Sequence, residues 1–394
     1  MFSVNEAIDS LLDDCQRLVE SEEIDLISAL GRTLAEDIFA SLDVPPADNS
    51  AMDGYAFRQV DWQDVQSEIP LSQRITAGSV PQALEPGTAA RIFTGAQVPA
   101  GADTVVMQEH CEGSEESVRI HRLPGMGANI RPRGQDITTG QKILPAGHRM
   151  RGQDMGLLAS QGIGKITVYR RLKVAILSTG DELAEPGKEL KDGQIYNSNR
   201  FTMHGQLADW GFEVVDLGVA RDDPEAIREL FARAAAAADV ILSSGGVSVG
   251  EEDHVKDVVE SLGSIDLWKI AIKPGKPFAF GQVKGTPFLG LPGNPVSVFV
   301  TMLIIGRPYL FCCQGITDTT VHSMRQTACF EKRGSAREDY LRVRLGETGL
   351  EPFSSQSSGV LLSTSWGDGL VRQPVHEDIK QGDLVEFLPW PILN

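Results

Sequence analysis

The sequence contains little cysteine and carries no excess of positive charge. Its five cysteines are an odd number without a C-x-x-C spacing, which argues against a disulfide framework or a structural zinc site. We therefore expect free thiols in a reducing cytoplasm at Cys15, Cys111, Cys312, Cys313 and Cys329. The 36 basic and 54 acidic side chains give a net charge of −18, which argues against nonspecific nucleic-acid binding. An anionic substrate would need a local cationic pocket to overcome this average field.

Targeting and membrane-spanning patterns are also missing. The first residues have no basic cluster ahead of an apolar stretch, so they do not resemble a secretory signal. The longest apolar run, residues 296–306, is too short to cross a bilayer. Neither G-x-G-x-x-G nor the P-loop pattern occurs, and no histidine stands beside serine or cysteine in a triad signature. We expect a cytoplasmic protein with no nucleic-acid and no membrane partner.

The 394 residues are enough for two to four domains, and the first part of the chain combines helical and β patterns. A capping box at Ser3 and Glu6 opens a predicted amphipathic helix over 4–19, and a second short helix is expected over 26–34. Short apolar runs between glycines and prolines predict an all-β region from 50 to 145. The predicted division is an N-terminal helical/linker domain of residues 1–45 with 140–171, interrupted by an inserted all-β domain at 46–139.

From residue 172 onward, strand and helix patterns alternate. Buried-strand runs at 174–177 and 239–242 each precede a helical pattern, and Asp223 followed by Pro224 marks a helix start. Such alternation predicts a doubly wound, mostly parallel sheet with helices on both faces. The fold class is therefore multidomain α/β plus β, with a central α/β domain at 172–315 and a C-terminal β-barrel-like domain at 320–394.

One predicted strand ends in a loop suited to binding an anion. Ligands of doubly wound sheets bind beyond the carboxyl ends of the strands. Ser244, Gly245 and Gly246 follow the strand at 239–242 and offer a hydroxyl group and free backbone N–H groups. A tight strand-to-helix turn would need the same glycines, so both interpretations stay open.

Three lysines follow this loop in a segment rich in proline and glycine. Lys269 and Lys273 are separated by an even number of residues, which would place both on one face of an extended chain. Lys276 follows in the sequence Lys-Pro-Gly-Lys-Pro. In a chain of net negative charge, three cations beside a glycine-rich strand end predict a phosphate or oxyanion pocket.

Carboxylates are expected at the same edge of the sheet. Glu182 follows the first α/β strand, and Asp222 and Asp253 lie where a strand leads into a helix. Carboxylate oxygens beside bound phosphate suit Mg²⁺ or another divalent cation. We therefore predict Glu182, Asp222 and Asp253 as metal ligands, whereas Asp223 is interpreted as a helix cap.

Several polar islands of the sequence resemble the motifs of one known family. They are DNSAMDGYA at 48–56, TGA at 94–96, R-x-R-G-x-D at 131–136, STGDEL at 178–183, SSGGVSVG at 243–250, KPGKP at 273–277 and GLPGNPVS at 290–297. Together they resemble the MoeA family of molybdopterin molybdenumtransferases, which also includes the E-domain of gephyrin. The first of these motifs makes the resemblance specific, because molybdopterin adenylyltransferases and CinA-like proteins share only the α/β part.

The resemblance implies a reaction and an assembly. Molybdate would be inserted into the dithiolene of adenylylated molybdopterin, which releases AMP and gives molybdenum cofactor. The protein would be a homodimer whose active sites are each shared between the α/β domain of one protomer and the β insertion of its partner. The resemblance and the motifs above together predict catalytic roles for Asp53, Glu182, Asp222 and Asp253, and substrate-binding roles for Thr94, Arg131, Asp136, Ser244, Gly245, Gly246, Lys269, Lys273 and Lys276.

Two other functions stay open on the sequence. A gephyrin-like scaffold would bind receptor peptides, and a molybdopterin adenylyltransferase would consume ATP rather than release AMP in the presence of molybdate. The upstream adenylyltransferase is also a candidate partner. The family's C-terminal serine is not assigned; Ser363, Thr364 and Ser365 lie in the corresponding region.

Overall fold

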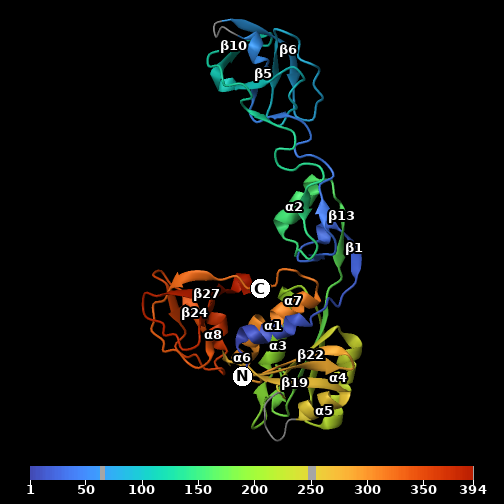
Figure 1. The fold of residues 1–394 in the computed structure, drawn as a ribbon, viewed down its shortest axis with the longest axis vertical. Coiled ribbons are helices and arrows are strands. Elements are labelled where there is room, and N and C mark those ends of the chain that lie inside the picture. The colour runs from blue at the N-terminus through green and yellow to red at the C-terminus, as the bar shows by residue number, and fades with distance from the viewer. Residues whose placement is uncertain (63–66, 247–253, 394) are drawn as a thin grey trace. The chain divides into compact units, whose positions relative to one another are not determined.

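The computed structural model describes residues 1–62, 67–246 and 254–393 and divides the chain into two compact units (Figure 1). The first unit comprises Met1–Glu36, Ala146–Arg151 and Lys165–Asn394, and the second comprises Asp37–Pro145 and Gly152–Gly164. The second unit contains the whole of the predicted β insertion. The finer division into four domains stays a prediction.

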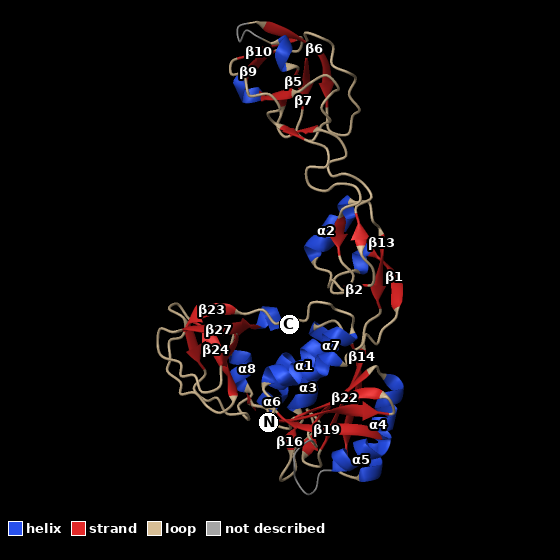
Figure 2. Ribbon diagram, viewed as in Figure 1, coloured by secondary structure: helices blue, strands red, loops and turns tan. Residues whose placement is uncertain are grey.

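A six-stranded sheet forms the centre of the first unit (Figure 2). Its strands are β14 (Lys173–Thr179), β17 (Glu213–Ala220), β18 (Val240–Ser244), β19 (Gly263–Lys269), β21 (Pro277–Val283) and β22 (Thr286–Leu291). The order is β17-β14-β18-β22-β21-β19, with parallel pairing from β17 to β22 and antiparallel pairing from β22 to β19. The predicted parallel sheet is confirmed, with an antiparallel extension at one edge.

Helices pack on both faces of this sheet because successive strand residues point to opposite sides. On one face, α3 (Ser198–Asp209) packs in the same core as Ile176 of β14. On the other face, α4 (Pro224–Ala237) and α5 (His254–Leu262) pack in a second core with Ala175, the preceding residue of β14. The doubly wound arrangement therefore follows from the two-residue period of the strand.

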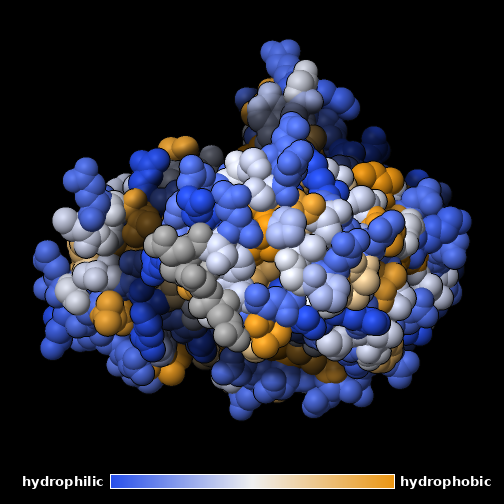
Figure 3. Space-filling model, turned by 90° about the horizontal axis from the view of Figure 1, so that it is seen from above, coloured by the Kyte–Doolittle hydropathy of each residue, from blue (hydrophilic) through white to orange (hydrophobic). Residues whose placement is uncertain are grey.

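One long apolar helix runs through the first core. It consists of α6 (Pro295–Thr301), a π-helical turn (Met302–Gly306) and α7 (Arg307–Cys313). The 19 residues of this helix are long and apolar enough to cross a membrane by length and composition. However, 89% of its most apolar stretch is buried inside the protein, as in the core helix of a globular domain. The helix therefore continues beyond Gly306, where the apolar run of the sequence ends, to Cys313, and Pro308 lies in the first turn of α7. On the face seen in Figure 3, apolar side chains form small patches separated by hydrophilic ones.

The first helix, α1 (Val4–Asp13), begins at the predicted capping box. It ends at Asp13 rather than at residue 19, because the chain then turns to α7, where Leu18 N donates to Cys313 O at 2.9 Å. The expectation of five free thiols is also wrong. Cys15 forms a disulfide with Cys312, and their Cα atoms are 6.5 Å apart. Because 297 residues separate the two cysteines, no local sequence pattern indicated that they pair.

The helix predicted over 26–34 is wrong as well. β1 (Ser21–Asp25) and β2 (Thr33–Leu34) instead flank β13 (Lys165–Tyr169) in a three-stranded antiparallel sheet. Only Leu26–Ser28 form a single 3₁₀ turn. Gly31 has a φ of +72°, which a right-handed helix cannot contain. β13, which is more than 130 residues away in the sequence, supplies the hydrogen bonds to β1 and β2, so the local pattern of residues could not reveal this sheet.

The C-terminal part is a β structure, as predicted. Its strands are β23 (Met324–Thr327), β24 (Glu338–Leu345), β25 (Leu350–Pro352), β26 (Gly369–Gln373) and β27 (Leu384–Pro389), together with β20 (Ile272–Lys273) from the α/β part. The order is β20-β24-β26-β27-β23, and β25 pairs with β24. A segment of the α/β domain is thus an edge strand of the C-terminal sheet.

The second unit is built mainly of short strands, which confirms the β prediction. Its six-stranded sheet has the order β8-β5-β7-β6-β10-β9. These strands are β5 (Gly54–Phe57), β6 (Glu68–Ile75), β7 (Ala89–Ile92), β8 (Thr104–Met107), β9 (Cys111–Gly113) and β10 (Ser117–Ile120). Two short pairs, β4 (Asn49–Ser50) with β11 (Ile130–Arg131) and β3 (Ile38–Phe39) with β12 (Lys142–Leu144), and the helix α2 (Gly152–Ser160) complete it.

A thiol count tests the corrected cysteine assignment. Cells are lysed in excess iodoacetamide under denaturing conditions without reductant, and the intact mass of the chain is measured. Since one disulfide protects Cys15 and Cys312, three alkyl groups are expected before reduction and five after it. Five groups without reduction would show that both thiols are free in the cell.

Candidate active site

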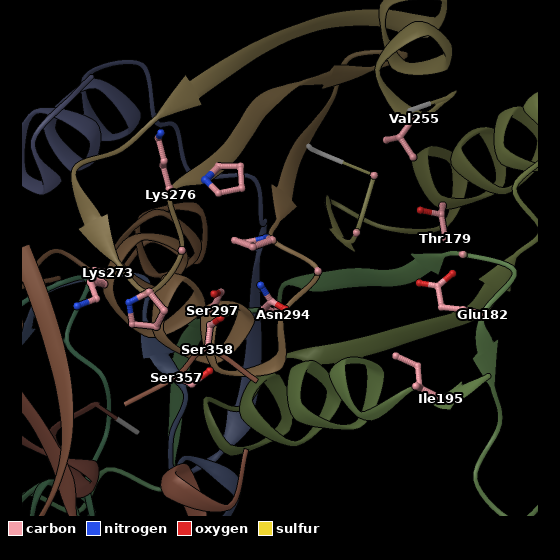
Figure 4. Close-up of a pocket in the computed structure, with 18 of the residues that line it drawn as sticks. Thr179, Glu182, Ile195, Val255, Lys273, Lys276, Asn294, Ser297, Ser357 and Ser358 are labelled. Atoms are coloured by element: carbon pink, nitrogen blue, oxygen red, sulfur yellow. The ribbon is translucent and has the colours of Figure 1, made fainter. Parts of the chain in front are cut away.

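One cavity of about 940 Å³ lies at the carboxyl ends of the parallel strands in the first unit (Figure 4). Its walls come from the loops that follow β14, β17, β18 and β22, from residues 273–277, and from the C-terminal domain. Doubly wound sheets bind ligands at this edge. Among the residues that the structure describes, the charged lining groups are Glu182, Asp222, Lys273, Lys276 and Arg337.

Backbone geometry requires both glycines after β18. Gly245 has a φ of +87° and Gly246 a φ of +67°, and a Cβ added to Gly246 would lie 2.2 Å from Val255 Cγ2. Both glycines also line the cavity, so the turn and the ligand-facing loop are the same structure. Ser244 is 2% exposed, with its hydroxyl 3.0 Å from Ser178 Oγ. Ser244 lies inside the sheet and is not among the described residues that line the cavity. No contact therefore supports its predicted role in substrate binding.

Two of the three predicted metal ligands line this cavity. Glu182 and Asp222 are exposed there, and Asp222 N donates to Asp181 Oδ1 at 3.1 Å. Asp253 lies outside the described residues. Among the residues that the structure describes, no group of three His, Cys, Asp or Glu side chains could hold a metal. Two carboxylates fit Mg²⁺ nevertheless, because it usually completes its coordination with waters and substrate phosphates.

The three predicted lysines are not equivalent. Lys276 and Lys273 line the cavity, and Lys273 Nζ is 2.9 Å from Oδ2 of the buried Asp339. Lys269 is exposed and does not belong to the described lining. The inference of one shared face is wrong, because β19 ends at Lys269 and Lys273 belongs to β20 in another sheet. The proposed substrate role of Lys269 stays untested.

The C-terminal domain contributes lining residues that we did not predict from the sequence. Arg337, Gln356, Ser357 and Ser358 face the cavity. The serine-rich run 354–358, a polar break between two β patterns, was the available signal. Ser363, in the region left unassigned, is fully buried and donates to Val360 O at 2.7 Å.

The serine loop is held by a buried arginine. Arg342 Nη2 donates to Ser357 O at 3.3 Å, and Arg342 N donates to Gln356 Oε1 at 2.9 Å. Burial lowers the pKa of Arg342 to about 10, and the charge of Asp339 acts in the opposite sense. The start of α6 fixes the loop from the other side, where Val296 N donates to Ser358 O at 3.0 Å. The two serines are therefore anchored through their backbone, which leaves their hydroxyl groups at the cavity wall.

Asp53 and Thr94 meet within the second unit. Asp53 Oδ1 accepts from Thr94 N and from Thr94 Oγ1, each at 2.8 Å. These two bonds, backbone first, lower the pKa of the Asp53 carboxyl, and the charge of Arg91 adds a smaller effect. The carboxylate is thus held ionised and oriented although it is only half-buried.

Arg131, at the end of β11, and Asp136, in the loop that follows, are exposed in the second unit. Two carboxylates fix this loop between them: Arg133 N donates to Asp48 Oδ1 at 2.7 Å, and Arg133 Nε donates to Asp43 Oδ2 at 2.5 Å. The predicted site residues therefore fall into two groups, one on each compact unit.

Comparisons with known proteins cover nearly the whole chain. Three family profiles match: MoeA N-terminal region (domain I and II) at residues 2–162, probable molybdopterin binding domain at 175–311, and MoeA C-terminal region (domain IV) at 327–390. A molybdopterin molybdenumtransferase of Haemophilus influenzae is 43% identical over 80% of this chain and 78% of that protein. A protein of the same name from a Nostoc species is 37% identical over 95% and 89%.

Solved structures agree with the sequence comparisons. The molybdopterin biosynthesis MoeA protein of Pyrococcus horikoshii OT3 superposes with a TM-score of 0.85 at 28% identity. The superposition covers 98% of this chain and 99% of that protein. The similarity therefore includes both compact units and the C-terminal sheet.

Gly246→Ala should damage the cavity edge. The new Cβ would collide with Val255 and hold an unfavourable φ, so a loss of about 1–3 kcal/mol in the free energy of unfolding is expected by urea denaturation. Gly205→Ala in α3 is the control, because its Cβ meets nothing within 4 Å and should stabilise the helix by about 0.5–1 kcal/mol. Equal effects of the two changes would refute the steric argument.

Proposed function

The chain belongs to the MoeA family of molybdopterin molybdenumtransferases, and we propose that the cavity at the ends of its parallel strands is the site of molybdenum insertion. The enzyme transfers molybdate into the dithiolene of adenylylated molybdopterin and releases AMP. Named relatives over most of the chain favour this activity over the peptide-binding scaffold and the adenylyltransferase. We also propose a cytoplasmic location.

The distribution of charge in the cavity carries the proposal. Figure 4 shows Thr179 and Glu182 on one side and Lys273, Ser297, Ser357 and Ser358 on the other. Both substrates are anionic, and two unit charges about 4 Å apart repel by about 4 kcal/mol at an effective dielectric constant near 20. The cationic, hydroxyl-lined side of the cavity can hold one anion, and the carboxylate side can hold the other through a bound divalent cation, so the two charges are separated.

We assign molybdate to the cationic side. Lys276 and Arg337 would offset the charge of the oxyanion, and the hydroxyl groups of Ser297, Ser357 and Ser358 would donate hydrogen bonds to its oxygens. Lys273 is already paired with Asp339, so its main part would be to keep the wall in place and add positive field. The molybdenum substrate would then lie where the pterin sulfurs can reach it.

We assign the phosphates of the adenylylated pterin to the glycine loop and the carboxylate side. Gly245 and Gly246 let a phosphate approach the backbone closely, because they carry no side chain. Glu182 and Asp222 would hold Mg²⁺, with Asp253 as a proposed third ligand. The bound cation would neutralise charge that develops on the phosphate as the P–O bond breaks. These side chains position the reactants, and the pterin itself supplies the sulfur ligands.

We further propose that the active site is completed by the partner of a homodimer. Asp53, Thr94, Arg131 and Asp136 all belong to the second unit, whereas the cavity belongs to the first. The family resemblance implies functional residues in both units, which supports this proposal. A two-fold dimer would let each second unit serve the cavity of its partner.

Lys276 provides the test of the reaction and of the molybdate side. The wild-type protein should release AMP from adenylylated molybdopterin only when molybdate is added. Lys276→Ala should raise the molybdate concentration for half-maximal release by about tenfold or more, since a hydrogen bond to a charged group contributes about 1.5–3 kcal/mol. Lys165→Ala is the control, because that lysine forms only an exposed ion pair with Glu23 at 2.9 Å. Absence of AMP from the wild type would reject the function, and equal molybdate dependence would reject the side assigned.

Mixed dimers test the shared site. Asp53→Ala and Asp222→Ala homodimers should each be inactive, because each lacks one part of every site. After random subunit exchange about half the dimers are mixed, and one of the two sites in each is intact. About a quarter of wild-type AMP release should return. Continued inactivity after exchange, verified by native mass spectrometry, would place both residues in one protomer's site.

A further inference from the structure

Asp53 is held in place by hydrogen bonds and close packing with other segments of the second unit. Besides its two side-chain bonds to Thr94, Asp53 accepts a bond at its own carbonyl from Gln108 N at 3.0 Å. The next residue, Gly54, is packed so closely that an added Cβ would lie 1.8 Å from Val106 O. The carboxylate therefore has the direction that the surrounding backbone imposes on it.

Arg91 joins these segments to one another. Its Nη1 donates to Gly54 O at 2.8 Å, and its Nη2 donates to Gln108 Oε1 at 2.6 Å. Arg91 lies on β7 directly opposite Tyr55 of β5, and its Cζ is 5.0 Å from the Tyr55 ring centre. The rigid, planar fork of a guanidinium holds two such bonds in fixed directions from separate nitrogens, whereas an ammonium is a single nitrogen on a flexible stem. Thr94 lies three residues after Arg91. Residues 91–94 therefore hold the Asp53 carboxylate through Thr94, and hold Gly54 and Gln108 through Arg91.

We propose that Arg91 is a positioning residue of the molybdenum-insertion reaction, which orients Asp53 by clamping Gly54 and Gln108 to the strand that leads to Thr94. This inference rests on the proposed function, because it concerns a residue that the function requires. Arg91 does not need to touch a substrate. Its contribution is the geometry of the half-buried Asp53 carboxylate.

The neighbouring strand offers a matched control. Arg74 of β6 lies directly opposite Arg91, and both guanidinium groups stack on Phe93, with centroid distances of 4.9 and 4.6 Å. Arg74 is exposed and has the same charge and the same aromatic neighbour. Its stacking does not involve Gly54 or Gln108. A change at Arg74 therefore removes a similar charge and stacking contact without opening the clamp.

The experiment compares Arg91→Gln, Arg74→Gln and wild type in the full-length protein. AMP release is measured at saturating substrates, and the Asp53 carboxyl is titrated by NMR with ¹³C-labelled aspartate, its signal identified with Asp53→Asn. Arg91→Gln should lower turnover by about 100-fold, the cost of a misplaced group at a reacting centre. The pKa of Asp53 should rise toward its ordinary value, chiefly because its bonds to Thr94 loosen and to a smaller extent because the positive charge of Arg91 is lost. Arg74→Gln should leave both quantities unchanged.

The outcomes separate the positioning role from the function. The positioning role would be overturned if Arg91→Gln kept wild-type turnover, or if it lost turnover while the Asp53 pKa did not change. Neither result would affect the proposed function, which is tested by AMP release from the wild type. If Arg91→Gln does not fold, Arg91→Lys keeps the charge but has no fork, and it should show the same two changes to a smaller degree. Wild-type values for both in Arg91→Lys would also overturn the proposal. The titration needs no substrate, so it can be read even if the wild type releases no AMP.

Discussion

The cavity depends on a two-residue strand pairing between domains of the first unit. Ile272 and Lys273 lie in register with Glu338 and Asp339, so the α/β chain forms the edge of the C-terminal sheet. The ion pair from Lys273 to Asp339 at 2.9 Å reinforces this edge, since the carboxylate is only 1% exposed and its other cationic neighbour, Lys332, is 3.7 Å away. Arg337 immediately precedes the paired segment of the C-terminal sheet. The pairing thus brings the cationic groups of two domains to one wall.

The opposite wall depends on the parallel sheet. The strands from β17 to β22 are parallel and end at one edge, so the loops that carry Glu182, Asp222 and Gly246 lie close together although they are far apart in the sequence. Gly246 keeps this edge open because a side chain there would collide with Val255 of α5, and a Cβ at Gly245 would lie 3.2 Å from Thr179 O. Two walls of opposite charge character follow from two sheets that share one short segment. This is the physical basis for bringing together two anions that repel each other in solution.

Local signals predicted much of this structure. The N-cap at Asp223, whose carboxylate accepts from Ala226 N at 2.9 Å, and the buried runs of the parallel strands are short-range patterns, and the structure confirms them. The misses involve long-range partners: Cys15 with Cys312, and the strand at 21–25 with the strand at 165–169. In the site, the positions of Glu182, Asp222 and Lys276 followed from motifs. The serine loop did not, because only the folded C-terminal sheet brings Ser357 and Ser358 to the α/β domain.

Anomalous diffraction at the molybdenum edge tests the location of the chemistry most directly. Crystals of the full-length protein would be soaked with molybdate at low concentration, with and without adenylylated molybdopterin. The account predicts one strong anomalous peak within contact distance of Lys276, Arg337 and the hydroxyl groups of Ser357 and Ser358. A dominant peak elsewhere on the protein, with this cavity empty of molybdenum, would contradict it.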